Sequence, residues 1–131
     1  MAEYNSGWDL TRVASGAMDA TSGTVNINKY CFVQMVAGVE KEVILANSGA
    51  VCLGVLQNNP RDGEHATVRY AGSTKIRLAS SLGVGIEVVA SSGGYARPAL
   101  DAGAVSSGSI MGLLITGATS GAVGEMLLQR R

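Results

Sequence analysis

The single histidine of the chain, His65, follows two acidic residues, Asp62 and Glu64, and these side chains are the first candidates for chemistry. An imidazole held by a carboxylate acts as a general base for hydrolysis when a nucleophile lies beside it. The sequence has no Gly-x-Ser-x-Gly turn that would present a serine. We therefore interpret His65 as a solvated histidine next to a turn. A small hydrolytic or ligand-binding barrel around it stays open as an alternative.

Metal and cofactor sites are not indicated either. One histidine and two separated cysteines, Cys31 and Cys52, cannot supply the four ligands of a closed zinc site. Asp62 and Glu64 are too few for a calcium loop. Nothing selects a pair for glycoside hydrolysis among the acids at or beside predicted strand ends, which are Glu40, Glu42, Glu87 and Glu125. We expect no catalytic residue, no metal and no cofactor, and we predict that the protein is not an enzyme.

Both cysteines lie inside apolar runs, Tyr-Cys-Phe-Val and Val-Cys-Leu-Gly, without the paired spacing of a metal site. This placement is typical of buried thiols in a protein made in a reducing cytoplasm. Residues 1–9 carry two acids and no base, and they lack an apolar segment of the length that a secretory signal needs. Export by that route is not expected.

Charge and composition exclude further classes of partner. Ten Lys and Arg balance ten Asp and Glu in 131 residues, so no basic excess draws the chain to nucleic acid or anionic lipid. Residues 102–124 carry no charge, but Gly and Ser interrupt them too often for a membrane-spanning helix. Charged residues make up 15% of the chain, against about 25% in ordinary domains. We expect a small-residue, nearly neutral surface that another protein covers, with neither nucleic acid nor membrane as a partner.

From residue 25 onward, short runs of Val, Ile, Leu and Tyr alternate with Gly, Ser, Asn and Asp, which is typical of a small all-β domain. The predicted strands are 27–37, 41–46, 51–57, 65–71, 74–79, 85–90, 94–97, 109–116 and 122–129. The only helix that the pattern allows is a short one over 98–104, with Pro at its start and Gly near its end. We predict a small β-barrel or β-tulip-like sandwich.

Alternation of apolar and polar residues is cleanest over 65–71 and 74–79. Ala66, Val68 and Tyr70 are expected to face the core, as are Ile76 and Leu78, with the basic and polar residues between them facing water. The short stretch between the two runs, Ala-Gly-Ser at 71–73, predicts a hairpin.

Residues 1–23 form an extended N-terminal arm in this scheme, and residues 24–131 form the β domain. The arm mixes Gly, Ser, Asn and Thr with isolated large groups and shows no periodic core face. The isolated large groups are Tyr4, Trp8, Leu10, Val13 and Met18. A Trp in a polar arm commonly docks into a pocket of a partner, and the alternative is that Trp8 folds back on its own domain.

A weak internal repeat appears at an offset of 58 residues. Gly-Val-Leu at 54–56, Gly63 and the apolar positions at 68 and 70 correspond to Gly-Leu-Leu at 112–114, Gly121 and the positions at 126 and 128. Each copy reads as strand, turn, strand. Two such hairpins predict a pseudo-symmetric sheet that closes on itself and so removes its exposed edges.

The central block over 54–69, Gly-Val-Leu-Gln-Asn-Asn-Pro-Arg-Asp-Gly-Glu-His-Ala-Thr-Val-Arg, resembles the head decoration, or capsid cement, proteins of tailed bacteriophages. Three later segments resemble the sequence pattern of the same family. They are Gly-Tyr-Ala-Arg-Pro-Ala at 94–99, Gly-Leu-Leu at 112–114 and the closing Gly-Glu-Met-Leu-Leu at 124–128. The likeness covers roughly residues 25–129.

This resemblance implies a small β-barrel that binds the outside of an assembled shell of major capsid protein, often as a trimer, without enzyme activity. It also implies that an N-terminal arm with Tyr4, Trp8, Leu10 and Arg12 contacts the capsid. Two interpretations of the basic tail, Arg130 and Arg131, stay open: a solvated end of the chain, which is the simpler one, or a subunit interface in which the tail pairs with acids of a neighbouring subunit. Another phage structural part of the same architecture, such as a tail tube or head-completion subunit, stays open as an alternative.

Overall fold

The structure, a computed structural model, describes residues 7–15, 29–60, 63–99 and 111–128. Within these ranges the chain forms nine strands and one short 3-10 turn, and it forms no α-helix. The elements are β1 (Gly7–Ala14), β2 (Phe32–Met35), β3 (Glu42–Leu45), β4 (Gly54–Leu56), β5 (His65–Arg77), β6 (Glu87–Ala90), η2 (Ser92–Gly94), β7 (Ala96–Pro98), β8 (Gly112–Thr116) and β9 (Val123–Leu128). The predicted all-β class is confirmed. In these ranges no helix is long and apolar enough to cross a membrane.

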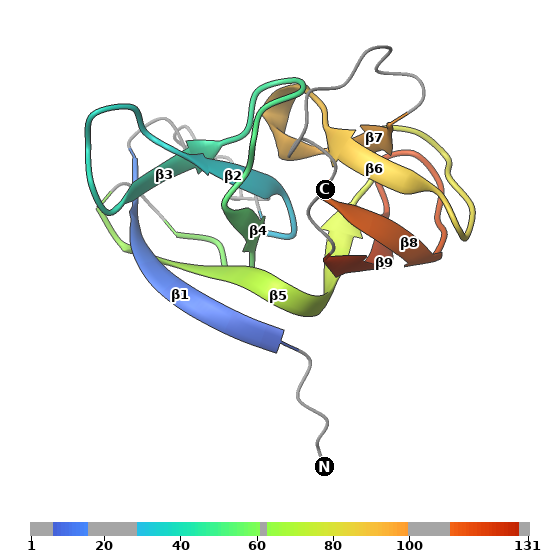
Figure 1. The fold of residues 1–131 in the computed structure, drawn as a ribbon, viewed down its shortest axis with the longest axis horizontal. Coiled ribbons are helices and arrows are strands. Elements are labelled where there is room, and N and C mark those ends of the chain that lie inside the picture. Colours follow the sequence, from blue (N-terminus) through green and yellow to red (C-terminus); the bar gives the residue numbers. More distant parts are fainter. Residues whose placement is uncertain (1–6, 16–28, 61–62, 100–110, 129–131) are drawn as a thin grey trace, which may run out of the picture.

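All nine strands belong to one sheet, in the order β1-β3-β2-β4-β5-β9-β8-β6-β7. The long strand β5 has partners in both halves of this sheet. Its first half pairs with β1 and β4, and its second half pairs with β9. Figure 1 shows β5 running beneath β2, β3 and β4 and continuing to the group β6 to β9.

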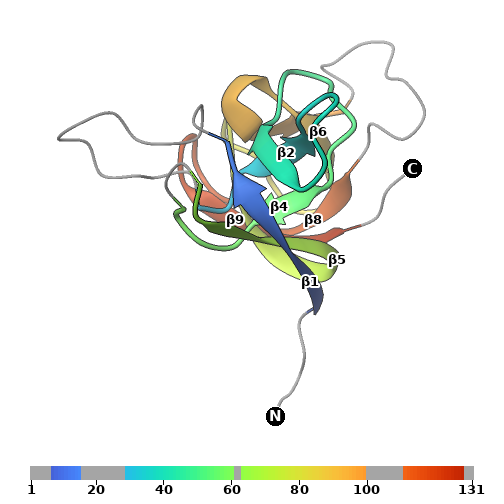
Figure 2. The same cartoon turned by 90° about the vertical axis from the view of Figure 1, so that its left-hand side faces the viewer.

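The strand pairings close two rings. Ring 1 consists of β1, β3, β2, β4 and the first half of β5, and β1 closes it by pairing in parallel with β3 and antiparallel with β5. Figure 2 shows β1 crossing β5 at this closure. Ring 2 consists of the second half of β5, β9, β8, β6 and β7. It closes where Leu78, directly after β5, forms a parallel bridge with Ala96.

The two rings repeat one another strand by strand. Leu56 of β4 pairs with Val68 of β5, and 58 residues later Leu114 of β8 pairs with Met126 of β9. Two further sets of paired residues correspond by their place in the ring, although most of their offsets along the chain differ from 58. They are Val33–Gly54 with Val88–Gly112, and the parallel closures Ala14–Val43 with Leu78–Ala96. The internal repeat is confirmed, and it extends beyond one hairpin to the whole ring.

Glycines at the start of β4 and β8 show the same constraint in both rings. A Cβ atom on Gly54 would overlap the carbonyl oxygen of Arg69, and a Cβ atom on Gly112 would lie 2.7 Å from the carbonyl oxygen of Leu127. Arg69 and Leu127 are themselves equivalent positions of β5 and β9. Neighbouring strands therefore approach each other closely at the same point of each ring, and only a residue without a side chain fits there.

Two packed cores fill the rings. The core of ring 1 contains Ala14, Val33, Val43, Leu56, Ala66 and Val68. The second core fills ring 2 and extends to the outer face of ring 1, and it contains Phe32, Ala46, Cys52, Val55, Ile76, Leu78, Leu82, Val88, Ala90, Ala96, Met111, Leu114 and Met126. β4 and the first two residues of β2, Phe32 and Val33, are thus buried on both faces, which explains why the sequence does not alternate in polarity there.

The hairpin predicted over 71–73 is wrong, because residues 65–77 form one continuous strand. Gly72 has a φ of 91°, a backbone conformation that glycine adopts without strain. The same residue pairs with Gly7 of β1 and with Leu128 of β9. The chain therefore bends at Gly72 and passes from ring 1 to ring 2 without reversing. A short stretch of small residues in the sequence is compatible with a hairpin and with a bent strand, so it does not distinguish them.

The helix predicted over 98–104 is not supported at its start, because Pro98 is the last residue of β7. Residues 100–104 lie outside the described residues.

The N-terminal segment contributes a strand that the sequence pattern did not indicate. β1 pairs with β5 from Gly7 to Val13 and with β3 at Val13 and Ala14. The backbone of Trp8 pairs with β5 of its own domain, whereas its side chain is 66% exposed, so the docking of this side chain into a partner stays a prediction. Residues 1–6 and 16–23 of the predicted arm lie outside the described residues.

Candidate interaction surfaces

His65 lies exposed as the first residue of β5, directly after the turn at Gly63 and Glu64. The side-chain amide of Asn58 donates to the carbonyl oxygen of His65 at 3.0 Å, and its oxygen accepts from the backbone amide of Thr67 at 3.1 Å. Glu64 is exposed, and Asp62 lies outside the described residues. Among the described residues, no three His, Cys, Asp or Glu side chains come together as a metal site would require.

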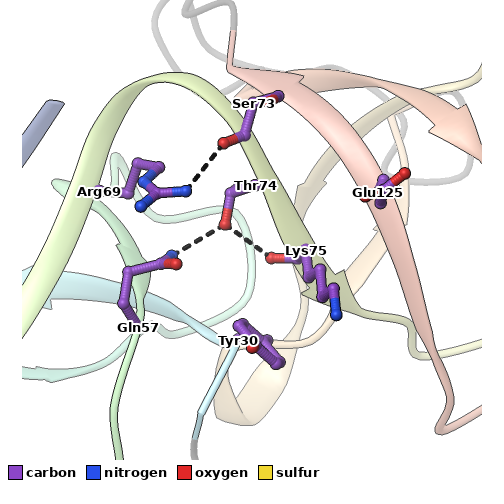
Figure 3. Close-up of a pocket in the computed structure, with 7 residues that line it drawn as sticks. All are labelled: Tyr30, Gln57, Arg69, Ser73, Thr74, Lys75 and Glu125. Carbon is purple, nitrogen blue, oxygen red and sulfur yellow. Dashed lines mark hydrogen bonds between the residues drawn. The ribbon is translucent and has the colours of Figure 1, made fainter. Parts of the chain in front are cut away.

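A polar pocket of about 190 Å³ lies where ring 1 meets the second half of β5 (Figure 3). Its lining residues are Tyr30, Gln57, Arg69, Ser73, Thr74, Lys75 and Glu125. The Gln57 side-chain amide donates to the buried Thr74 hydroxyl at 2.8 Å, and that hydroxyl donates to the carbonyl oxygen of Lys75 at 2.9 Å. These bonds join β4 to β5 and satisfy the buried hydroxyl. We therefore interpret the pocket as a structural junction between the rings.

Arg69 links the same junction to β1. Its Nε donates to Asp9 Oδ1 at 2.8 Å, and its Nη1 donates to the carbonyl oxygen of Ser73 at 3.2 Å. A guanidinium with two partners on different strands holds the N-terminal end of β1 against β5.

Next to this ion pair lies an exposed aromatic pair. Trp8 and Tyr70 are 6.1 Å apart between ring centroids at an interplanar angle of 65°, an edge-to-face contact. Trp8 is 66% exposed and Tyr70 is 38% exposed. The prediction that Tyr70 faces the core is wrong, because the pairing of β5 with β4 ends at Arg69 and the core layer of ring 1 does not extend over the next residue. The alternating pattern gives no sign of where the covering layer stops.

The other predicted arm residues divide between strand and undescribed chain. Leu10 and Arg12 are half-buried on β1, where they pair with Val68 and Ala66 of β5. Tyr4 lies outside the described residues, as do Arg130 and Arg131.

A second surface feature is an apolar groove of about 360 Å³ beside the end of β2. Its lining residues are Gln34, Met35, Ala50, Val51, Cys52 and Leu53. Met35 is 39% exposed and Val51 is 58% exposed. Large apolar side chains of this exposure in a shallow groove are typical of a protein-binding surface. The sequence analysis did not single out this groove, because its residues come from a strand and a loop that only the fold brings together.

Both cysteines are buried, as predicted, and neither forms a disulfide. Burial raises the pKa of the Cys31 thiol from 9.0 to about 11, against the opposing effect of the Arg77 charge and hydrogen bond. Cys31 therefore stays protonated and unreactive in the folded protein at neutral pH.

The raised pKa predicts a loss of stability in alkaline solution. The folded state holds the Cys31 proton where the unfolded chain has released it, so the free energy of unfolding is unaffected well below pH 9 and falls as the pH rises from 9.0 to about 11. We expect the wild type to lose about 2 kcal/mol more than Cys31→Ala over this window, measured by urea titration at each pH. Equal losses in the two proteins would show that the buried thiol does not titrate in this way.

Comparison with known proteins shows similarity at the level of the fold. No protein-family model matches the chain, and no curated protein matches it. Among solved structures, the chain is similar to the head fiber gp8.5 N base in bacteriophage phi29, with a TM-score of 0.67 and 15% sequence identity. The match covers 93% of this chain and 93% of that one. The chain therefore shares, over nearly its whole length, the fold of a protein from a bacteriophage head.

Proposed function

We propose that the chain is a structural protein of a phage virion that decorates the outer surface of the capsid and bridges neighbouring capsomers of the major capsid protein. The observation that carries this proposal is the fold shared with the phi29 head fiber base over 93% of both chains. The sequence resemblance to capsid cement proteins supports it independently. A tail tube or head-completion role has no comparable support.

The proposed mechanism is linkage. A protein that binds only the closed shell, across seams between capsomers, stabilises that shell by a free energy that grows with its concentration relative to its dissociation constant. A homo-oligomer, for which we favour a trimer, makes several such contacts at once, and these reinforce one another when the geometry lets all engage. Arg130 and Arg131 are proposed to pair with acids of the neighbouring subunit.

The direct test mixes purified protein with shells that lack it and images the product by electron microscopy. We expect many copies on the outer surface and a higher melting temperature of the shell. A single ring at one vertex, copies in the tail, or no binding at all would contradict the proposal.

For the capsid contact we propose the N-terminal end of the molecule, with Tyr4 and Trp8 at its centre and with Leu10 and Arg12 behind them on β1. The support is the exposure of Trp8, 66%, which leaves most of its ring free for a partner. Deletion of residues 1–20 is not a clean test of this arm, because it removes β1 and opens ring 1.

A point substitution tests the capsid contact without that damage. Trp8→Ala is expected to weaken shell binding about 30-fold, since a Trp at the centre of an interface contributes about 2 kcal/mol or more. The free energy of unfolding should change by less than about 0.5 kcal/mol, because the side chain is largely exposed. Val84→Ala, at a 70% exposed position of ring 2, is the matched control and should bind normally. Sedimentation with shells measures the binding of both variants. Unchanged binding by Trp8→Ala would show that Trp8 is not part of the capsid contact.

A further inference from the structure

The outer face of ring 1 packs on ring 2 and shares its core. Among the described residues, no segment packs in the same way on the equivalent positions of ring 1. Ala90 and Ile76 of ring 2 are fully buried in the core that also contains Phe32 of ring 1. The strand registers make Met35 and Arg12 the equivalent positions of ring 1. Met35 is 39% exposed and Arg12 is only half-buried. Positions that the internal contact buries in ring 2 are therefore open in ring 1.

The apolar groove beside β2 is the uncovered counterpart of that internal contact. In ring 2, the carbonyl oxygen of Ala90 accepts a hydrogen bond from the backbone amide of Gly49 of ring 1 at 2.9 Å, so a loop of ring 1 is seated there. In ring 1 the equivalent residue, Met35, lines the groove together with Leu53. Leu53 is half-buried, whereas its ring 2 equivalent Met111 is 2% exposed.

Ring 2 has a matching face that the described residues cover only in part. Across ring 1, a row of paired residues on the outer face faces ring 2, namely Phe32, Val55 and Arg69. Phe32 and Val55 in this row are fully buried. The equivalent row of ring 2 is Glu87, Leu113 and Leu127. All three of its members are only half-buried, and Ile115 near them on β8 is 46% exposed.

We propose that copies of the chain associate head to tail, with the Glu87-Leu113-Leu127 row of one copy seated on the Met35 groove of the next. The contact between copies then repeats the contact between the two rings of one chain. Two different surfaces meet, so the association is heterologous. It continues from subunit to subunit until the subunits form a closed cyclic oligomer or an open filament. This inference goes beyond the proposed function and does not depend on it.

Charge supports a second copy as the occupant of the groove. Inside the chain, Gly94 lies so close to Phe32 that a Cβ atom on Gly94 would be 2.5 Å from the Phe32 carbonyl oxygen. Counting two residues back from the equivalent positions Val43 of β3 and Ala96 of β7 places Lys41 at the position of Gly94, and the strand register places Glu87 at that of Phe32. A lysine thus faces an acid where the internal contact is apolar and tight.

Arg12 adds a second cation to the same surface of ring 1. It stands at the position of Ile76, and its buried Nε has no hydrogen-bond partner among the described residues. A contact with this polar content is more readily reversed than the apolar contact within the chain, as suits association between folded subunits.

A mixing experiment distinguishes head-to-tail association from every symmetric alternative. Met35→Asp disables the groove and leaves the row intact, whereas Ile115→Asp disables the row and leaves the groove intact. Both side chains are substantially exposed, so both variants are expected to fold, which circular dichroism checks. Leu113→Asp serves as a second variant of the row. Light scattering after size-exclusion chromatography measures the masses of the wild type, each variant and their mixtures, and Trp8→Ala is the control.

The wild type and Trp8→Ala are expected to have the mass of an oligomer, and each Asp variant alone that of a monomer. An equimolar mixture of Met35→Asp with Ile115→Asp should have the mass of a dimer, because one intact groove meets one intact row. A monomeric wild type, an oligomer that survives Met35→Asp, or a mixture that stays monomeric would overturn the inference. Loss of shell binding by Met35→Asp with an unchanged oligomer would assign the groove to the capsid instead, and would leave the proposed function standing.

Discussion

Gly54→Ala is expected to lower the free energy of unfolding by about 3 kcal/mol, because the new methyl group would overlap the carbonyl oxygen of Arg69 on the neighbouring strand. That oxygen belongs to the backbone of β5, so it cannot move aside as a flexible side chain would. Relief requires β4 and β5 to separate, and both strands are part of ring 1. Urea denaturation followed by circular dichroism measures the change.

Two other glycines serve as references for this substitution. Gly83→Ala places its methyl group where no atom lies within 4 Å, and it should change stability by less than about 0.5 kcal/mol. Gly112→Ala, at the equivalent position of ring 2, is expected to destabilise as well, since its methyl group would lie 2.7 Å from the carbonyl oxygen of Leu127. If Gly54→Ala were as stable as Gly83→Ala, the close approach of β4 and β5 would be contradicted.

Phe32→Ala should cost about 3–5 kcal/mol, the range for truncation of a fully buried aromatic side chain. Phe32 comes from ring 1 and is buried in the core that fills ring 2, so it joins the two rings. Phe32→Leu keeps much of the volume and is expected to cost clearly less.

Unfolding should remain one transition in both Phe32 variants, because the rings share β5 and the second core. The fluorescence of Trp8, the single tryptophan, reports on ring 1, and far-ultraviolet circular dichroism reports on all strands. Coincident transitions are expected from the two probes. A cost below about 1 kcal/mol for Phe32→Ala, or separate transitions, would show that the rings are independent units.

Most strands could be predicted from the sequence, because residues on a half-buried strand alternate in polarity. Ala66 and Val68 carry this signal, and both are fully buried. β1 was missed because Arg12 stands on the face where the pattern requires an apolar residue. That face is only partly covered, so a charged residue is tolerated there, and the strand has no periodic apolar face by which it could be recognised.

Of the candidate residues, the sequence could single out Trp8 as an isolated aromatic group in a polar segment. It could not place Trp8 against Tyr70, since β1 and β5 meet only through strand pairing over a long separation in sequence. The Met35 groove was beyond prediction for the same reason, because it combines the end of β2 with the loop before β4.

Three properties could be predicted from the sequence alone. They are the all-β class, the repeat of Gly-Val-Leu as Gly-Leu-Leu with the turn glycines after each, and the burial of both cysteines. These properties follow from local composition and spacing, which act on each segment wherever the chain places it. Tertiary structure alone decided that β5 bends at Gly72 instead of reversing, that two rings share it, and that one ring covers its neighbour while its own equivalent face stays open. Those features depend on which distant backbone groups pair and on where a covering layer ends, and neither is encoded in the pattern of any single segment.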